Sequence, residues 1–284
     1  MKPAAPAVRE FHYRVRHGAA GHVPGAHRSR RGEAGLEFRG HVPLTQAPDT
    51  RRIDVHASLR DAFGQWQVRV FSERKAVAVV VIADLSASMG YRGVRRKLDV
   101  LADFTQAAAE SAWRAGDSFG FIGCDERLRR DWLLPPTRRR GLGGLLAQRL
   151  RRLDPQGSAI GLAEAARALP HRRALVFLVS DFHLPIADLE TVLGGLAHHE
   201  VVPVMVWDRQ EFDPPRNGLI QLADPESGEQ TLVWVRPALR ERWRAVQAGR
   251  RAALQALFHR HRLDPLVLDD GYRADAVSAH FVQG

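Results

Sequence analysis

Two apolar segments, each followed by an acidic residue, constrain the fold of this chain more than any other feature. Residues 76–83 form a continuous run rich in β-branched side chains that leads into Asp84. Residues 174–179 form a second run, which leads into Ser180 and Asp181. Runs of this length without polar alternation are typical of strands that are buried on both faces. Such strands belong to parallel sheets covered by helices on both sides, so the two segments predict an α/β protein.

Further strand and helix patterns alternate along the chain. Apolar residues recur at helical spacing in residues 93–114, 142–153 and 238–262, and in the last of these helices we expect Val246 to face the core. Short apolar runs at residues 118–124 and 201–207 predict two further strands. This alternation predicts a doubly wound, mostly parallel sheet.

Weaker patterns complete the expected element order. An edge strand is expected at residues 127–134, where Pro135 and Pro136 should stop it. A short helix is expected at residues 159–169, with Ser158 or a neighbour as its N-cap.

The chain is expected to consist of an extension and one main domain. Residues 1–71 are predicted to be an N-terminal extension, with a mobile start followed by a segment that packs on the core. Residues 72–284 are predicted to form the α/β domain. Turn-forming residues at 224–228 predict a β-hairpin insertion near residues 219–236 of that domain.

Composition narrows the functional classes. The 284 residues carry 42 Lys and Arg against 32 Asp and Glu, a formal net charge of +10 that would suit an anionic partner. The arginines are scattered among acidic residues, and no nucleic-acid-binding motif accompanies them, so the sequence does not favour nucleic-acid binding. The single cysteine, Cys124, excludes an internal disulfide and a Cys-rich metal site.

Membrane and export signals are not apparent in the sequence. No apolar stretch approaches the roughly 18 residues that a membrane span needs. The first residues, Met1 to Arg16, are polar and charged where a signal peptide would be apolar. We therefore expect a cytoplasmic protein without a membrane span.

Acidic and hydroxyl side chains follow the predicted buried strands. Asp84, Ser86 and Ser88 form the pattern D-x-S-x-S, and alternate positions in an extended loop point the same way. Ser158 follows the helix predicted at residues 142–153, and Asp181 follows the second buried strand. Hydroxyl and carboxylate oxygens are hard ligands that suit Mg²⁺, with Mn²⁺ or Ca²⁺ as related ions. The alternative is that these residues only cap helices.

These motifs resemble those of the DUF58 family, a bacterial branch of proteins with a von Willebrand factor A (vWA) domain. The resemblance rests on Arg31-Gly32, Glu37-Phe38, Arg52-Ile53-Asp54, Arg60, Phe71-Ser72-Glu73-Arg74, the run from Asp84 to Met89, Gly116-Asp117, Asp181, residues 222–229 and residues 276–282. The vWA domain carries a metal-ion-dependent adhesion site (MIDAS) built from D-x-S-x-S, a later Thr and a later Asp. Ser158 stands where that pattern has Thr, and keeps the hydroxyl.

The resemblance implies a function in protein assembly. It implies a metal-dependent protein-binding adaptor with no catalytic residues, working with a MoxR-type AAA+ ATPase. The expected role is chaperone-like: maturation, metal insertion or assembly of a client that presents an acidic residue to the metal. Relatives in methanol-oxidation gene clusters suggest a methanol-dehydrogenase-type client.

Two alternatives from other functional classes stay open. A Mg²⁺-assisted hydrolase would need a general base beside the metal, and His183, two residues after Asp181, is the candidate. A nucleic-acid-binding protein driven by arginine would show affinity that falls steeply with salt and ignores metal chelation.

Overall fold

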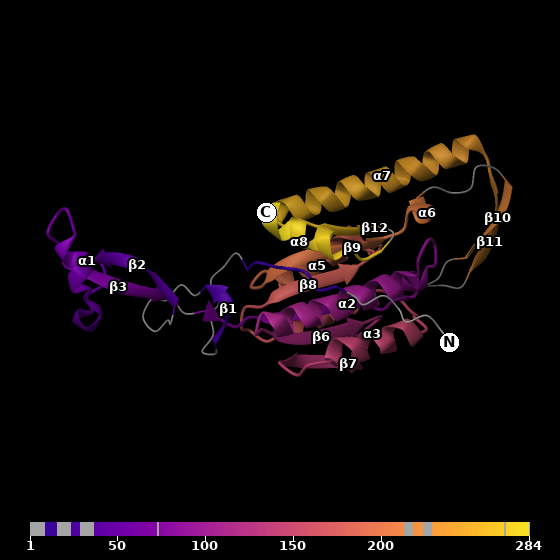
Figure 1. Cartoon of the computed structure of the whole chain (residues 1–284). Helices are drawn as coiled ribbons and strands as arrows, with labels where there is room; N and C mark the ends of the chain where they lie inside the picture. Colours follow the sequence, from indigo (N-terminus) through magenta and orange to yellow (C-terminus); the bar gives the residue numbers. More distant parts are fainter. Residues whose placement is uncertain are drawn as a thin grey trace. The chain divides into compact units, whose positions relative to one another are not determined.

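The computed structural model describes residues 9–15, 24–28, 37–72, 74–212, 218–223, 229–269 and 271–283 (Figure 1). The chain divides into two compact units. The first comprises Met1–Arg14, Ala78–Arg114 and Ser118–Gly284, and the second comprises Val15–Val77 and Ala115–Asp117. The start of the predicted N-terminal extension, which was expected to be mobile, lies mostly outside the described residues.

The first unit is built on a six-stranded sheet. In spatial order its strands are β12 (Leu266–Asp269), β9 (Glu200–Trp207), β8 (Leu175–Ser180), β5 (Ala78–Asp84), β6 (Ser118–Cys124) and β7 (Leu128–Thr137). All neighbouring pairs are parallel except β6 and β7, so the predicted doubly wound, mostly parallel sheet is confirmed. The chain goes from β5 to β6 on one side and returns to β8 on the other. The topological switch point is therefore at the carboxyl ends of the neighbouring strands β5 and β8, where open α/β sheets bind ligands.

The helices and short turns of this unit follow the strands in chain order. They are η2 (Ala87–Gly90), α2 (Lys97–Arg114), α3 (Leu142–Arg152), α4 (Leu162–Arg167), α5 (Ile186–Gly195), α6 (Arg209–Phe212), α7 (Pro237–Arg260) and α8 (Ala274–Gln283). No helix in the described part of the chain is both long enough and apolar enough to cross a membrane.

One face of the sheet is covered by α4, α5 and the end of α7. Val80 and Ile82 of β5 belong to this core, and so do Val176 and Leu178 of β8. Side chains alternate along a strand, so these even-numbered positions share one face. The helices contribute Leu162, Ala165, Ala166, Leu189, Val192, Leu193, Leu254, Leu257 and Phe258.

The opposite face carries an aromatic cluster. Phe177 of β8 packs edge-on against Phe104 of α2, with ring centroids 5.2 Å apart. Phe11, from the start of the chain, stacks on Phe104 at 5.7 Å, and its backbone N–H donates to Ser111 Oγ. Phe281 of α8 lies 6.1 Å from Phe177. The odd-numbered positions of the strands are thus buried as well, as expected for a sheet covered on both sides.

Three details differ from the sequence-based expectations. Strand β7 continues through Pro135 and Pro136 rather than stopping before them, which an edge strand tolerates because one side needs no ladder partner. Helix α4 begins at Leu162 with Gly161 as its N-cap, so the expected helix start was too early. Val246 is 68% exposed, because α7 contacts the core through residues in its last turns.

The described residues also form three two-stranded sheets besides the central one. Strands β10 (Gly218–Ala223) and β11 (Gln230–Val235) form an antiparallel hairpin. In the second unit, β2 (Glu37–Pro43) pairs with β3 (Gln67–Ser72), and β1 (Pro24–Arg28) pairs with β4 (Arg74–Lys75). Between β2 and β3 lie η1 (Thr50–Arg52) and α1 (Val55–Leu59).

Asp54 joins these parts of the second unit. Its carboxylate accepts the Ala57 N–H at the start of α1, and it also contacts Arg69 Nε at 2.7 Å and His41 Nε2 at 3.0 Å. The hydrogen bond from Arg69, together with those from Ala57 and His41, holds the pKa of Asp54 well below its usual range.

Candidate functional site

The D-x-S-x-S loop begins where β5 ends, at the switch point of the sheet. Asp84 is completely buried. One carboxylate oxygen accepts the Ser86 backbone N–H at 2.9 Å, and the other accepts the Ser180 hydroxyl at 2.6 Å. Ser180 is the last residue of β8, so this hydrogen bond joins the carboxyl ends of the two neighbouring strands.

The two loop serines point to the same place. Ser86 Oγ and Ser88 Oγ are 3.2 Å apart, and both residues are buried. The Ser88 hydroxyl also lies close enough to Asp181, the residue that follows β8, to help lower the pKa of its carboxyl group. Ser86 occupies the N-cap position of η2, yet its side chain makes no capping hydrogen bond. The helix-cap alternative therefore does not account for Ser86.

The loop between α3 and α4 lies against the D-x-S-x-S loop. The Ala87 N–H donates to the Gly157 carbonyl at 2.9 Å, and a Cβ on Gly90 would come within 2.7 Å of Pro155. Gly157 has a φ of +71°, a left-handed conformation that glycine adopts without strain. Ser158, half-buried, is the next residue and so stands beside the loop that holds Ser86 and Ser88.

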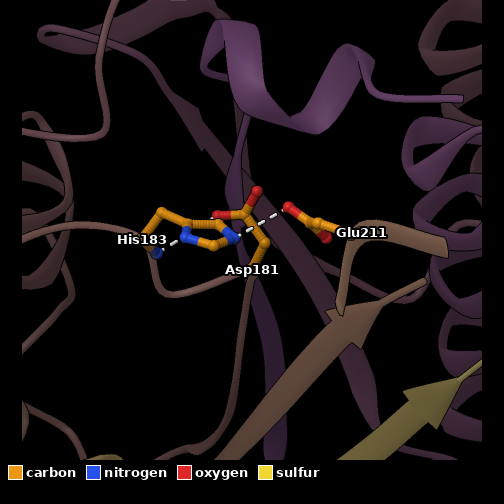
Figure 2. Close-up of side chains that lie close together, drawn as sticks. All are labelled: Asp181, His183 and Glu211. Carbon is orange, nitrogen blue, oxygen red and sulfur yellow. Dashed lines mark hydrogen bonds and ion pairs between the residues drawn. The ribbon is translucent and has the colours of Figure 1, made fainter. Parts of the chain in front are cut away.

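A buried lysine completes the surroundings of Asp181. Lys97, the first residue of α2, is 1% exposed, and its ammonium lies 2.7 Å from Asp181 and 2.9 Å from Glu211 of α6. The His183 backbone N–H donates to the other oxygen of Asp181 at 3.3 Å, and His183 Nε2 lies 2.9 Å from Glu211. Figure 2 shows Asp181, His183 and Glu211 turned towards one another.

The two strand-end carboxylates have opposite electrostatic environments. Burial, reinforced by the negative charge of Asp181, raises the pKa of Asp84 to about 6. Burial alone would raise the pKa of Asp181 too, but the charges of Lys97 and His183, together with the hydrogen bond from Lys97, outweigh it and hold that pKa below its usual value. Although burial opposes it, the negative charges of Asp181 and Glu211 raise the pKa of Lys97. Of these two carboxylates, Asp84 is thus the one whose negative charge the described protein groups compensate less.

His183 is held mainly as a hydrogen-bonded partner. Burial tends to lower its pKa, but the hydrogen bond to Glu211 and the nearby negative charges raise it above the usual value. Because Nε2 is bonded to Glu211, a role as general base would fall to the Nδ1 atom of His183. The hydrolase alternative therefore depends on whether Nδ1 can reach a metal-bound water.

The donor set fits a hard, six-coordinate cation. Asp84 supplies a buried carboxylate, Ser86 and Ser88 supply two adjacent hydroxyls, and the neighbouring Asp181 repels Asp84. A cation among these oxygens would relieve that repulsion and favour the ionised form of Asp84. Asp181, His183 and Glu211 also present ligand atoms within 4.8 Å of one another, but the Lys97 ammonium bridges Asp181 and Glu211 there.

Sequence analysis missed four residues of this site. Ser180 was seen only as the residue before Asp181, although its position at the end of a buried strand signals a hydroxyl at the switch point. Lys97 stands within a helical pattern, where a lysine usually marks a solvated face. Glu211 and Trp207 carry no such signal: Glu211 lies in a four-residue helix that the sequence did not predict, and Trp207 donates its indole N–H to the Asp181 carbonyl at 3.0 Å.

Comparison with known sequences identifies related proteins. The family model described as protein of unknown function DUF58 matches residues 45–253. An uncharacterized protein in the 3′ region of moxR from Paracoccus denitrificans is 39% identical over 107 residues, which cover 36% of this chain and 97% of that protein. An uncharacterized protein of Mycobacterium bovis is 33% identical over 89 residues, which cover 31% of this chain and 28% of that protein.

Comparison with solved structures gives distant matches. The conserved hypothetical protein BatB from Bacteroides thetaiotaomicron aligns with a TM-score of 0.48 and 13% identity, covering 73% of this chain and 98% of that chain. A von Willebrand factor type A structure from Catenulispora acidiphila aligns with a TM-score of 0.35 and 15% identity, covering 49% of this chain and 35% of that chain.

Proposed function

This chain belongs to the DUF58 family, and we propose that it is a metal-dependent protein-binding adaptor rather than an enzyme. The proposal rests on one observation: the buried Asp84 carboxylate and the Ser86 and Ser88 hydroxyls converge beside Asp181 at the switch point of the sheet. Mg²⁺ is the preferred ion, with Mn²⁺ or Ca²⁺ as alternatives.

Each residue of the set has a distinct task. Ser86 and Ser88 would bind the ion directly through their hydroxyls, and Ser158 would add a third. Asp84 and Asp181 would hold it from the strand ends, mainly through water. When bound, the ion would supply a positive charge that attracts a carboxylate from another protein. Lys97 fixes the orientation of Asp181 and keeps it ionised.

Binding suits this donor set better than catalysis. Hydroxyl ligands are neutral, so the ion would keep much of its charge for a partner carboxylate. A hydrolase would instead need a free general base beside the ion, and His183 Nε2 is already bonded to Glu211. We therefore keep the Mg²⁺-assisted hydrolase as the second candidate only.

The proposed partner is a MoxR-type AAA+ ATPase. One relative takes its name from its position in the 3′ region of moxR, and neighbouring genes often encode proteins that act together. The adaptor would connect that ATPase to a client presenting an Asp or Glu, in maturation, metal insertion or assembly. A methanol-dehydrogenase-type enzyme is one such client class.

The test is a titration of the chain against the MoxR-type ATPase of the same genome, with Mg²⁺ and with EDTA. Ser86→Ala and Ser88→Ala should each weaken binding at least about tenfold in Mg²⁺, because each removes a direct ligand. Thr191→Ala is the matched control: it removes a hydroxyl that bonds only within α5, to the Ala187 carbonyl, and should leave binding unchanged.

Two results would count against the proposal. Undiminished binding in EDTA, lost only as salt rises, would point to the basic surface instead of the metal site. Mg²⁺-dependent hydrolysis of a phosphate ester that His183→Ala abolishes would favour the hydrolase.

A further inference from the structure

The second unit carries an exposed apolar surface on α1 and on the turn that follows it. Its side chains are Val55, Leu59, Phe63 and Trp66, which are 56%, 79%, 86% and 57% exposed. Single exposed apolar residues are common on proteins, but these four recur at intervals of three or four residues and so form a patch. Such patches mark contact sites for proteins or membranes. We call these four residues the apolar ridge.

Helix α1 is attached to β3 by its inner side (Figure 1). The half-buried Ser58 donates its hydroxyl to the Asp54 carbonyl at 2.7 Å and accepts the Gln67 backbone N–H of β3 at 2.8 Å. Val55 and Leu59 are four residues apart, which places them on the same side of the helix. The inner contacts therefore fix α1 in an orientation that leaves these two apolar side chains in water.

The turn after α1 is organised around the Asp61 carboxylate. One of its oxygens accepts the backbone N–H groups of Phe63 and Gln65 at 3.1 and 2.8 Å, and the other accepts the Gln67 side-chain amide at 2.9 Å. The Gly64 N–H donates to the Asp61 carbonyl at 3.1 Å, and Gly64 has a φ of +64°, which glycine adopts without strain. These bonds hold Phe63 at the tip of the turn, away from the rest of the protein.

Basic side chains lie beside the apolar ridge. His56 and Arg60 each follow an apolar residue of the ridge by one position, so they form a second row along α1. Both are exposed. Arg51 of η1 is exposed as well, and neither Arg51 nor Arg60 has an acidic partner among the described residues. The helix thus joins an apolar side to a basic one, as helices that lie in a membrane interface do.

Most acidic side chains of this region are already paired. Asp49 lies 3.3 Å from Arg52, and Asp54 lies 2.7 Å from Arg69. Asp61 has no cationic partner among the described residues, and its carboxylate is bonded to N–H groups of the turn. Residues 49–69 contain four arginines and three aspartates. The charge that remains beside the ridge is therefore positive and complements an anionic surface.

The shape and composition of the apolar ridge favour a membrane over a protein partner. A side chain as exposed as Phe63 stands clear of its neighbours, so the tip of the turn is convex. A lipid interface deforms around a convex tip, whereas a protein partner needs a hollow of matching shape. Phe and Trp side chains accompanied by Arg are also the residue types that enter the interfacial layer of a bilayer.

We propose that the apolar ridge docks the second unit on an anionic lipid bilayer. Phe63 and Trp66 enter the interfacial layer, and α1 lies along it on its apolar side. Arg51 and Arg60 contact the lipid phosphates. The contact is peripheral and needs no metal ion, so it is separate from the adaptor function proposed above.

The test is co-sedimentation of the full chain with vesicles, in EDTA and at low salt. One vesicle set is phosphatidylcholine alone, and the other contains about one third phosphatidylglycerol, which gives an anionic surface. We expect binding to the anionic vesicles, and Phe63→Ala and Trp66→Ala should each weaken it at least about tenfold through loss of inserted apolar area. Trp234→Ala is the matched control: Trp234 of β11 is 62% exposed but belongs to the first unit, so binding should change less than about twofold.

A charge reversal tests the basic row. Arg60→Glu should weaken binding to the anionic vesicles at least about tenfold, because it replaces an attraction with a repulsion. Arg242→Glu makes the same change in net charge on α7 of the first unit and should weaken binding less than about threefold. Equal losses in these two variants would show attraction to net charge alone and would overturn the proposal.

Three further results would overturn the docking of the apolar ridge on lipid. The first is no binding to the anionic vesicles, and the second is equal binding to both vesicle sets. The third is a dimer in sedimentation velocity that Phe63→Ala dissociates, which would assign the ridge to a second copy of the chain. Ser86→Ala should leave vesicle binding unchanged, so failure of the metal proposal and failure of this one remain distinguishable.

Discussion

Asp84 combines two influences that both disfavour its charge, burial and the neighbouring Asp181. Its pKa of about 6 in the folded chain exceeds the unfolded value of 3.8, so the folded state binds the proton more tightly. The contribution to stability is complete below about pH 4 and is lost as pH rises through about 6. A bound cation favours the ionised form, so metal affinity should fall as pH drops below about 6.

The first prediction compares wild type with Asp84→Asn in EDTA. Asparagine does not titrate, so the difference in unfolding free energy between the two proteins should change by roughly 2–3 kcal/mol between pH 4 and pH 7. Urea denaturation at a series of pH values measures it. A difference that stays constant over this range would show that Asp84 titrates normally.

Lys97 neutralises two acidic side chains, one of them fully buried. Lys97→Met should destabilise the protein by roughly 3–5 kcal/mol, because it leaves Asp181 and Glu211 without their cation. Mg²⁺ should stabilise this variant more than wild type, since the carboxylates become available to a metal ion. Thermal denaturation with Mg²⁺ and with EDTA tests both effects.

Arg114→Met is the control for that substitution. Arg114 ends the same helix with an exposed side chain, and loss of its surface ion pairs should lower stability by less than about 1 kcal/mol. If Lys97→Met were as mild as this control, Lys97 would not be the counter-ion of the site.

At the scale of elements, α2 and α3 pack closely at one glycine. A Cβ on Gly143 would lie 2.6 Å from the Ala109 Cβ and 3.1 Å from the Gln106 carbonyl oxygen, so the two helices would have to separate. Nothing lies within 4 Å of the corresponding position on Gly144. The two adjacent glycines of α3 thus form a matched pair.

We expect Gly143→Ala to destabilise the protein by roughly 1–3 kcal/mol through overpacking. Gly144→Ala should stabilise it by up to about 1 kcal/mol, because alanine favours a helix over glycine. Chemical denaturation of both variants gives the comparison. Equal effects of the two substitutions would contradict the close packing of α2 on α3.

In the second unit, Asp54 is predicted to make α1 and the β2–β3 pair sensitive to acid. Its pKa is depressed by Arg69, Ala57 and His41, so its contribution to stability is present above the unfolded pKa of about 4 and is lost as pH falls further. Asp54→Asn should reduce protection of the α1 amides from hydrogen exchange at neutral pH, and the difference from wild type should shrink in acid. Unchanged protection at neutral pH would contradict this prediction.

At the scale of the whole molecule, sequence patterns located the sheet but not the full site. The runs before Asp84 and Asp181 could be interpreted because burial on both faces leaves a continuous apolar signature. The contacts of Lys97 could not be predicted in this way. They join Lys97 to residues that follow it by 84 and 114 positions in the sequence, and local patterns carry no information about contacts so far apart. The five-residue metal set remains a prediction, although the structure joins Asp84, Ser86, Ser88 and Asp181 by hydrogen bonds and electrostatic contact, with Ser158 in the adjacent loop.

The net charge of +10 and the proposed metal contact should affect different rate constants of partner binding. Association with an acidic partner should slow as salt rises, because long-range attraction is screened. EDTA should instead accelerate dissociation, since it removes the proposed contact to the metal. Stopped-flow measurements across salt and chelator separate the two rates. An EDTA effect confined to association would contradict this division.

Phe11 lies near the start of the sequence but packs on parts of the first unit that are synthesised much later. Its ring is packed among Phe104 and Phe177, and its N–H bonds a serine 100 residues further along the chain. On the ribosome, this opening segment has no binding surface until α2 and β8 have been synthesised. In the sequence, the second unit is thus inserted into the first unit. The residues of the first unit that precede the insertion help to complete the aromatic core of that same unit. A deletion extending past Phe11 would therefore open the aromatic core, however dispensable an N-terminal end looks in the sequence.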